Sequence, residues 1–285
     1  MSVQSLSITA SSVCCALGDH RDAIAEELRR GRSGLAPLAA DAFEPPLPFS
    51  TCCGRLPAPL EALPPELASH DTRITRLAAA LYEGVAETVA AACWRYGDAR
   101  VGLFVGTSVA GIDLTELAYG RWLAEGVLPA SYDFDAQHAY HALLTVLRRL
   151  SGIAGPAAVI STACSSSGKA FASAQRALRA GLLDAALVGG LDVLCQTTLR
   201  GFHGLGVLSP EPCRPFCAER RGISIGEGGA LFVLEAAPAA EAPLMLLGVG
   251  ESSDAHHMSA PHPEGLGARL AMERALADAG LEASS

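Results

Sequence analysis

A regular alternation of short apolar runs and helical segments between residues 100 and 190 most restricts the fold of this chain. Strands are expected at residues 101–105, 156–160 and 185–190, and helices at residues 112–123, 137–150 and 170–180. The run from Ala185 to Gly190 contains no polar residue, as is typical of a strand buried on both faces of a parallel sheet. Strands that alternate with helices predict an α/β fold with a mainly parallel sheet.

The flanking segments add further elements to this pattern. Strands are expected at residues 4–10, 231–235 and 244–249, and helices at residues 21–30, 72–93 and 266–279. Apolar residues recur at helical spacing throughout residues 72–93, which predicts one long, mostly buried helix. Residues 35–66 are rich in proline and lack periodicity, so a long ordered excursion over the surface is expected there. Residues 199–208 are interrupted by glycines and are compatible with either a helix or a loop.

Composition excludes several classes of protein. Hydrophobic residues make up 50% of the 285 residues and the mean hydropathy is +0.29, which indicates a large core. So much apolar material also predicts surface that an oligomer interface or a partner covers. The formal net charge of −9 argues against nucleic-acid binding, which needs clustered Lys and Arg. No run approaches the ~18–20 apolar residues that cross a bilayer, so no membrane span is expected.

The sequence contains no recognisable metal or nucleotide motif. The nine cysteines include two adjacent pairs and no C-x-x-C spacing, which does not fit a structural zinc site. Three histidines in the loop at residues 252–265 also fit no common zinc pattern, so no metal is expected. Residues 222–229, GISIGEGG, lead into an expected strand and lack the G-K-[ST] ending of a phosphate loop. The odd number of cysteines and the lack of a signal peptide predict a reducing, cytoplasmic location.

One cysteine lies where a nucleophile would be expected. The strand at 156–160 is joined to the helix at 170–180 by residues 161–169, STACSSSGK. At that joint, Cys164 would meet free backbone N–H groups and the positive end of the helix macrodipole, which favour the nucleophilic thiolate. An inert core cysteine is the alternative that these residues leave open. The joint around Cys164 carries no G-x-S-x-G motif, so a serine hydrolase is not indicated there.

Four segments, in order, resemble the β-ketoacyl synthases, the condensing enzymes of fatty acid and polyketide assembly. The stretch STACSSSGKAFASAQRAL resembles the nucleophile segment, and VGLFVGTSVAG resembles the strand and loop that line the acyl pocket. GLGVLSPEPCRPFCAERRGISIGEGGALFVLE resembles a further family segment, although Cys217 stands where the family usually has an aspartate. SSDAHHMSAPHPEGLG resembles the mobile loop beside the active-site entrance.

The resemblance implies a thiolase-like fold in α-β-α-β-α layers, normally dimerised, with the N-terminal half complete and the C-terminal half truncated. Residues 1–240 would form the N-terminal nucleophile domain, and residues 241–285 the start of the C-terminal domain. Cys164 would accept an acyl group from an acyl carrier protein, and its own N–H would contribute to the oxyanion hole. Because the carrier's phosphopantetheine holds the substrates, no cofactor is implied.

The same resemblance implies further site residues. By position, Val109 and Phe202 would line the acyl pocket. The gating loop would contain Asp254, His257 and Met258. Arg73 and Arg76 are candidate contacts for the acidic carrier protein, and simple solvation of these two side chains is the open alternative.

The implied reaction is a decarboxylative Claisen condensation with malonyl-carrier protein. The two histidines that drive decarboxylation in the family lie in H-G-T-G-T and N-x-F-G-F motifs, which these 285 residues do not contain. Acylation of Cys164 is therefore the stage expected of this chain. Two alternatives stay open: a non-catalytic subunit that pairs with a complete synthase, and an incomplete sequence.

Overall fold

The centre of the structure, a computed structural model that describes all residues except 1–4, 40, 237–243, 258–259 and 284–285, is a six-stranded mixed sheet. Its strand order is β5-β4-β6-β8-β1-β9. The strands are β1 (Leu6–Cys14), β4 (Val101–Gly106), β5 (Ala157–Ile160), β6 (Ala185–Asp192), β8 (Gly228–Glu235) and β9 (Leu244–Leu246). A small second sheet contains β2 (Leu35–Pro37), β3 (Cys52–Gly54) and β7 (Ile225–Gly226).

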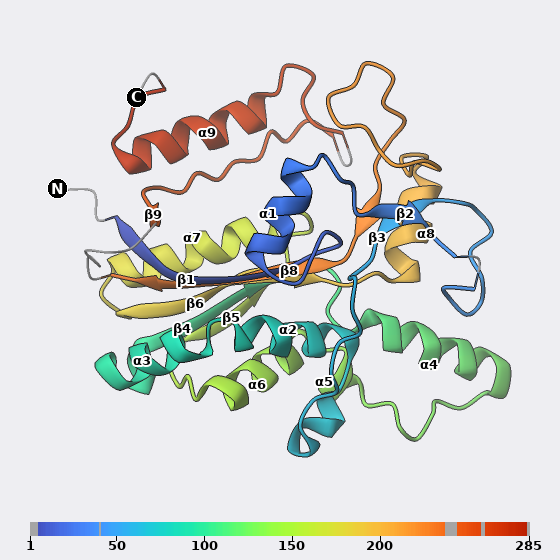
Figure 1. The fold of residues 1–285 in the computed structure, drawn as a ribbon, viewed down its shortest axis with the longest axis horizontal. Helices are drawn as coiled ribbons and strands as arrows, with labels where there is room; N and C mark the ends of the chain where they lie inside the picture. The colour runs from blue at the N-terminus through green and yellow to red at the C-terminus, as the bar shows by residue number, and fades with distance from the viewer. Residues whose placement is uncertain (1–4, 40, 237–243, 258–259, 284–285) are drawn as a thin grey trace.

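Helices cover both faces of the main sheet (Figure 1). On one face lie α2 (Arg73–Glu83), α3 (Ala86–Tyr96) and α6 (Tyr140–Ser151), and on the other α7 (Ser166–Arg179), with α9 (Leu266–Ala279) beyond it. The remaining helices are α1 (Arg21–Arg29), α4 (Ile112–Glu125), α5 (Phe134–Gln137) and α8 (Gln196–Gly204), with 3₁₀ turns at Pro65–His70 and Asp98–Arg100. Within the described residues, none of the helices has both the length and the apolarity to cross a membrane.

The central strands are buried on both faces, as the apolar run at residues 185–190 predicts. Leu103 of β4 and Leu187 of β6 pack in the core cluster under α2 and α6. Phe104 and Val188, the next residue of each strand, pack in the opposite cluster with α7. The alternation follows from the period of two in a strand and explains why neither strand has a polar face.

The prediction of a mainly parallel sheet is confirmed for the strands of residues 100–190 on which it rests and is wrong for the whole sheet. β4 pairs in parallel with β5 and β6, whereas the pairs β6–β8, β8–β1 and β1–β9 are antiparallel. The reason is the path after β6. Instead of crossing back over a face of the sheet, the chain forms α8 beyond the end of β6, so β8 starts from that end and runs in the opposite direction (Figure 1).

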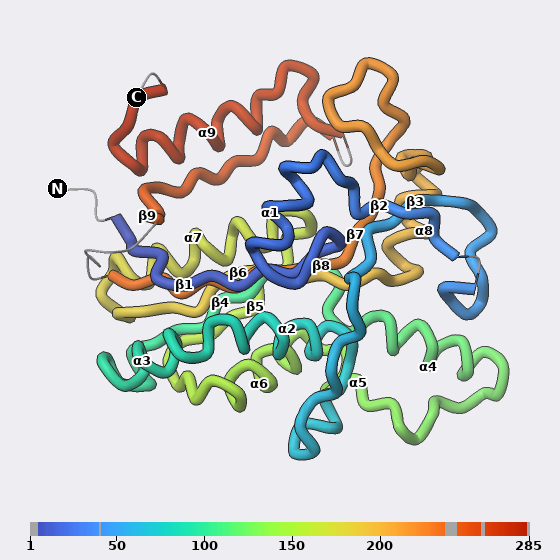
Figure 2. Tube along the Cα trace, viewed as in Figure 1, coloured from blue at the N-terminus to red at the C-terminus, as the bar shows by residue number. Residues whose placement is uncertain are grey.

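The prediction of one helix over residues 72–93 is also wrong, because the segment divides into α2 and α3 at Gly84. A Cβ atom at Gly84 would lie 2.6 Å from the Oγ of Ser12 in β1, so the chain approaches the sheet too closely there for a side chain. The strand expected at residues 244–249 ends at Leu246. Beyond it the chain runs between α9 and α7 (Figure 2), and Gly250 packs against the backbone of Ala271.

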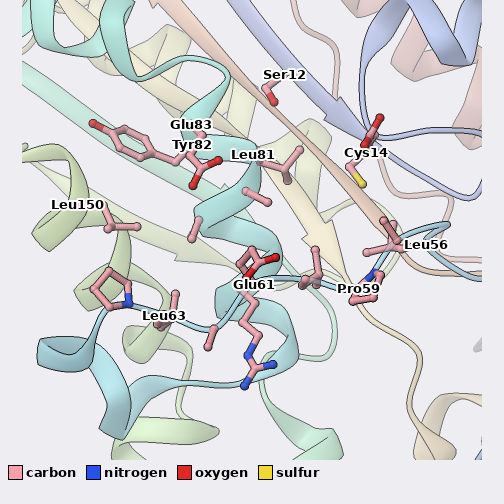
Figure 3. A pocket seen from close by; sticks show the side chains of 18 of the residues that line it. Ser12, Cys14, Leu56, Pro59, Glu61, Leu63, Leu81, Tyr82, Glu83 and Leu150 are labelled. Atoms are coloured by element: carbon pink, nitrogen blue, oxygen red, sulfur yellow. The ribbon is translucent and has the colours of Figure 1, made fainter.

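The proline-rich loop after β3 lies along α2 and encloses a pocket of about 380 Å³ (Figure 3). The pocket has an apolar lining that includes Leu56, Pro59, Leu63, Leu81 and Leu150. It shares no lining residue with the pocket beside Cys164 described below.

Candidate active site

Cys164 lies in the turn between β5 and α7, and its side chain is exposed. The hydroxyl of Ser165 donates to the carbonyl oxygen of Thr162 at 2.8 Å. The Oγ of Ser166 accepts from the N–H of Thr162 at 2.9 Å and donates to the carbonyl oxygen of Ala163 at 2.6 Å. These bonds hold a tight turn in which Ala163 has a φ of 53°, and they direct both hydroxyls to the backbone.

Two glycines allow the amino end of α7 to rest directly on the sheet. A Cβ atom at Gly106, the last residue of β4, would lie 2.4 Å from the backbone of Ser166 and Ser167. A Cβ atom at Gly190 in β6 would lie 2.1 Å from the Oγ of Ser167. The close approach brings Cys164 to the edge of the sheet where the parallel strands end.

Other cysteines are poorer nucleophiles. Cys14 and Cys53 are buried, and burial raises the pKa of each thiol to about 11. Both are therefore protonated at neutral pH, and the thiol form does not attack a thioester. Cys164 combines exposure with a position one residue before the N-cap of α7.

A pocket of about 500 Å³ opens beside Cys164. It is lined by Ser108, Ala163, Cys164, Thr197, Thr198, Gly201, Phe202 and Leu205. Phe202 and Leu205 give it an apolar wall, which suits a flexible hydrocarbon chain better than a polar substrate. The sequence singled out Phe202, and the structure brings it to Cys164. Ser108 lies in the segment expected to line the acyl pocket but was not singled out. The sequence missed Thr197, Thr198 and Leu205, because a wall built from a separate helix leaves no local pattern.

Val109 occupies a different place. Its side chain is 8% exposed and belongs to the main core cluster, whereas the preceding residue, Ser108, lines the pocket. An acyl-pocket role for Val109 stays a prediction.

One carboxylate binds several of the described residues of the loop at 252–265. Asp254 accepts from the backbone N–H of His262 at 2.8 Å and of His256 at 3.4 Å, and these N–H groups hold its pKa below the ordinary value. The Nδ1 of His257 accepts from the N–H of Ala260 at 3.2 Å. Met258 lies outside the described residues. In the part of the chain that the structure describes, no three His, Cys, Asp or Glu side chains converge as metal ligands.

The two arginines expected to contact a carrier protein are held in ion pairs within the chain. The guanidinium of Arg73 donates to both oxygens of Glu227, at 2.5 and 2.8 Å, and the Glu227 side chain is only 1% exposed. Arg76 pairs with Asp71 at 2.6 and 2.7 Å. A carrier contact by either residue stays a prediction.

Glu227 is a buried carboxylate that binds three segments of the chain, a role that the sequence did not indicate. Burial alone would raise the pKa of its carboxyl, but hydrogen bonds from Arg73 and from the N–H groups of Leu56 and Leu194 lower it below the ordinary value. The carboxylate therefore joins α2, the proline-rich loop and the segment after β6. Arg73 and Glu227 are 154 residues apart, so no local pattern could have linked them.

The chain is similar to proteins of known families. Residues 4–240 match the family described as Beta-ketoacyl synthase, N-terminal domain. Nodulation protein E of Rhizobium meliloti (strain 1021) is 33% identical over 288 residues, covering 97% of this chain and 69% of that protein. The 3-oxoacyl-[acyl-carrier-protein] synthase 2 of Staphylococcus aureus is 29% identical over 194 residues, covering 64% of this chain and 48% of that protein.

A solved structure extends the comparison to three dimensions. It is described as a ketosynthase (ApeO) in complex with its chain length factor (ApeC) from Xenorhabdus doucetiae. The superposition has a TM-score of 0.89 at 39% identity and covers 98% of this chain and 69% of that chain. This similarity confirms the predicted thiolase-like α/β fold class.

Proposed function

From the premise that this chain belongs to the β-ketoacyl synthase family, we propose that Cys164 accepts an acyl group from the thioester of an acyl carrier protein. The observation that carries the proposal is the exposed Cys164 at the amino end of α7, open to an apolar pocket of about 500 Å³. Such a pocket can hold the hydrocarbon tail while the sulfur reaches the carbonyl carbon.

The acylation step needs few groups. The Cys164 thiolate attacks the thioester carbonyl, a new C–S bond forms, the carrier's C–S bond breaks, and the carrier leaves as a thiol after taking up a proton. Backbone N–H groups at the turn stabilise the negative charge that develops on the carbonyl oxygen. The acyl-enzyme is then the electrophile for the carbanion of a decarboxylated malonyl-carrier thioester. We assign none of the described histidines to that decarboxylation.

Mass spectrometry of the intact protein and its peptides tests the acylation step. After incubation with an octanoyl-carrier thioester, we expect one octanoyl adduct on the peptide that contains residues 161–169. The variant C164A should lose the adduct, and the matched variant C217A should keep it. An adduct that persists in C164A, or that maps to another peptide of the wild type, would refute the assignment.

A second candidate function, pairing with another synthase-type chain, is favoured by an exposed apolar surface. The region from α4 to the start of α6 exposes several large apolar side chains: Leu117, Tyr119, Trp122, Leu123, Val127, Leu128, Phe134 and Tyr140. Large exposed apolar areas mark interaction sites. The similar ketosynthase from Xenorhabdus doucetiae was solved with a partner, its chain length factor.

Light scattering after size-exclusion chromatography tests this pairing. We expect the chain to associate with itself or with a co-expressed synthase subunit, and L123E to weaken that association. An unchanged assembly in L123E would argue against this surface.

We also propose a cytoplasmic location, which the nine free cysteines support.

A further inference from the structure

One lining residue of the Cys164 pocket, Ser108, lies in a turn that a single carboxylate holds in place. Asp192, the last residue of β6, accepts three hydrogen bonds from the turn that follows β4. The hydroxyl of Thr107 donates to its Oδ1 at 2.7 Å, and the N–H of Ser108 donates to the same oxygen at 2.8 Å. The hydroxyl of Ser108 donates to Oδ2 at 2.7 Å. Both carboxylate oxygens are thus used within one turn.

The bonds continue beyond the carboxylate. The Thr107 side chain is buried, and its Oγ1 also accepts from the N–H groups of Val109 at 3.4 Å and Ala110 at 3.2 Å. Its own N–H donates to the carbonyl oxygen of Ile160 at 3.1 Å, immediately before the segment that carries Cys164. Asp192 therefore supports the turn at residues 107–111 through Thr107, and that turn is joined to the end of β5.

The turn at residues 107–111 contains a strained residue and therefore needs such support. Ala110 has a φ of 48°, in the left-handed region that a non-glycine residue seldom adopts. A strained conformation persists only where surrounding bonds hold it. Without Asp192, Thr107 and Ser108 would lose their common acceptor and the turn could relax toward or away from the pocket.

We propose that Asp192 is a positioning residue that fixes Ser108 as one wall of the Cys164 pocket and thereby determines which acyl groups reach the sulfur. This inference rests on the proposed acylation of Cys164. Asp192 itself is not among the residues that line the pocket. Its carboxylate keeps the Ser108 hydroxyl engaged, so the wall presents a fixed shape to the acyl chain.

Three variants test the inference by their acylation rates with acetyl- and octanoyl-carrier thioesters. D192A removes all three acceptor bonds, and we expect the rate ratio between the two thioesters to change about tenfold, because misplacement near 1 Å costs up to ~10²-fold. In D192N the amide oxygen can keep the two bonds at Oδ1, while the amide N–H₂ donates to the Ser108 hydroxyl. D192N should therefore restore a ratio close to that of the wild type.

The matched control is Asp184, which precedes β6 at its other end and binds Arg100 at 2.7 Å. D184A should lower stability and leave the rate ratio unchanged. A wild-type ratio in D192A, or an equal change in D184A, would overturn the inference.

A second probe makes the result independent of the carrier protein. We expect D192A to change the ratio of Cys164 alkylation rates for N-ethylmaleimide and N-octylmaleimide, and D184A not to. If no carrier thioester acylates wild-type Cys164, the proposed function fails, and the maleimide ratio alone decides the role of Asp192. An unchanged maleimide ratio in D192A together with normal acylation of the wild type refutes only the role of Asp192.

Discussion

Replacing Arg73 should destabilise the fold far more than replacing Arg76, although the two residues lie one turn apart on α2. Each arginine binds a carboxylate through two hydrogen bonds, so the pairs match in geometry. They differ in the burial of the acid, because the Glu227 side chain is 1% exposed and that of Asp71 is 20% exposed. The comparison therefore isolates the effect of burial.

The expected magnitudes follow from that difference. R73M retains the apolar stem but leaves the charge of Glu227 buried without its cation, and such a loss costs about 3 kcal/mol. This is more than a hundredfold in the unfolding equilibrium, since about 1.4 kcal/mol is tenfold. With a denaturant slope of about 3 kcal/mol per molar, the urea midpoint should fall by about 1 M. R76M should cost less, about 1 kcal/mol, because the Arg76–Asp71 pair is partly exposed to solvent.

Urea unfolding followed by circular dichroism measures both variants. The double variant R73M/E227Q should be more stable than R73M, because the neutral amide removes the unpaired buried charge. Equal midpoints for R73M and R76M would refute the reasoning, and so would a double variant that is no more stable than R73M.

Two further predictions concern the pH dependence of stability and the packing of α7 on the sheet. Because the folded-state pKa of Glu227 is lowered, its stabilisation is complete above its ordinary pKa of about 4.5 and is lost as the pH falls through the folded value. The stability gap between wild type and R73M should therefore narrow as the pH falls below about 4.5. A gap that widens on acidification, measured by urea unfolding, would contradict this assignment. G190A should lower the free energy of unfolding by about 1–3 kcal/mol through overpacking against Ser167. Adding S167G to G190A should recover part of this loss. Thermal melts that show no recovery in the double variant would exclude this contact as the cause.

Local sequence signals predicted the bounds of helices that are terminated by a glycine. The helix predicted at residues 266–279 is α9 without a change at either end, and that predicted at residues 21–30 is α1 with one residue fewer. Gly31 and Gly280 follow these helices with φ of 66° and 67°, values that glycine adopts without strain. The joint at Cys164 was predictable in the same way, because an apolar run, small residues and a helical pattern follow one another directly.

Tertiary contacts decided the features that the sequence did not predict. The break at Gly84 depends on the nearness of Ser12 in β1. The helical periodicity of residues 72–93 gives no information about a strand elsewhere in the chain. Arg73 looked like a surface cation because its partner, Glu227, lies in a segment remote in sequence. The pocket wall at Ser108 depends on Asp192 in the same manner.

The pairing of β1 with β8 has a consequence for the order in which the chain acquires structure. Residues 101–192 form a contiguous unit of β4, β5, α7 and β6, whose contacts are comparatively local and quick to form. β1 is synthesised before this unit but pairs with β8, which follows it, and Thr9 and Val233, which meet across this pair, are 224 residues apart. During synthesis, β6 presents an unpaired apolar edge until β8 arrives, and such edges promote aggregation. The cysteine-bearing unit is thus organised before β8 and β1 complete its sheet.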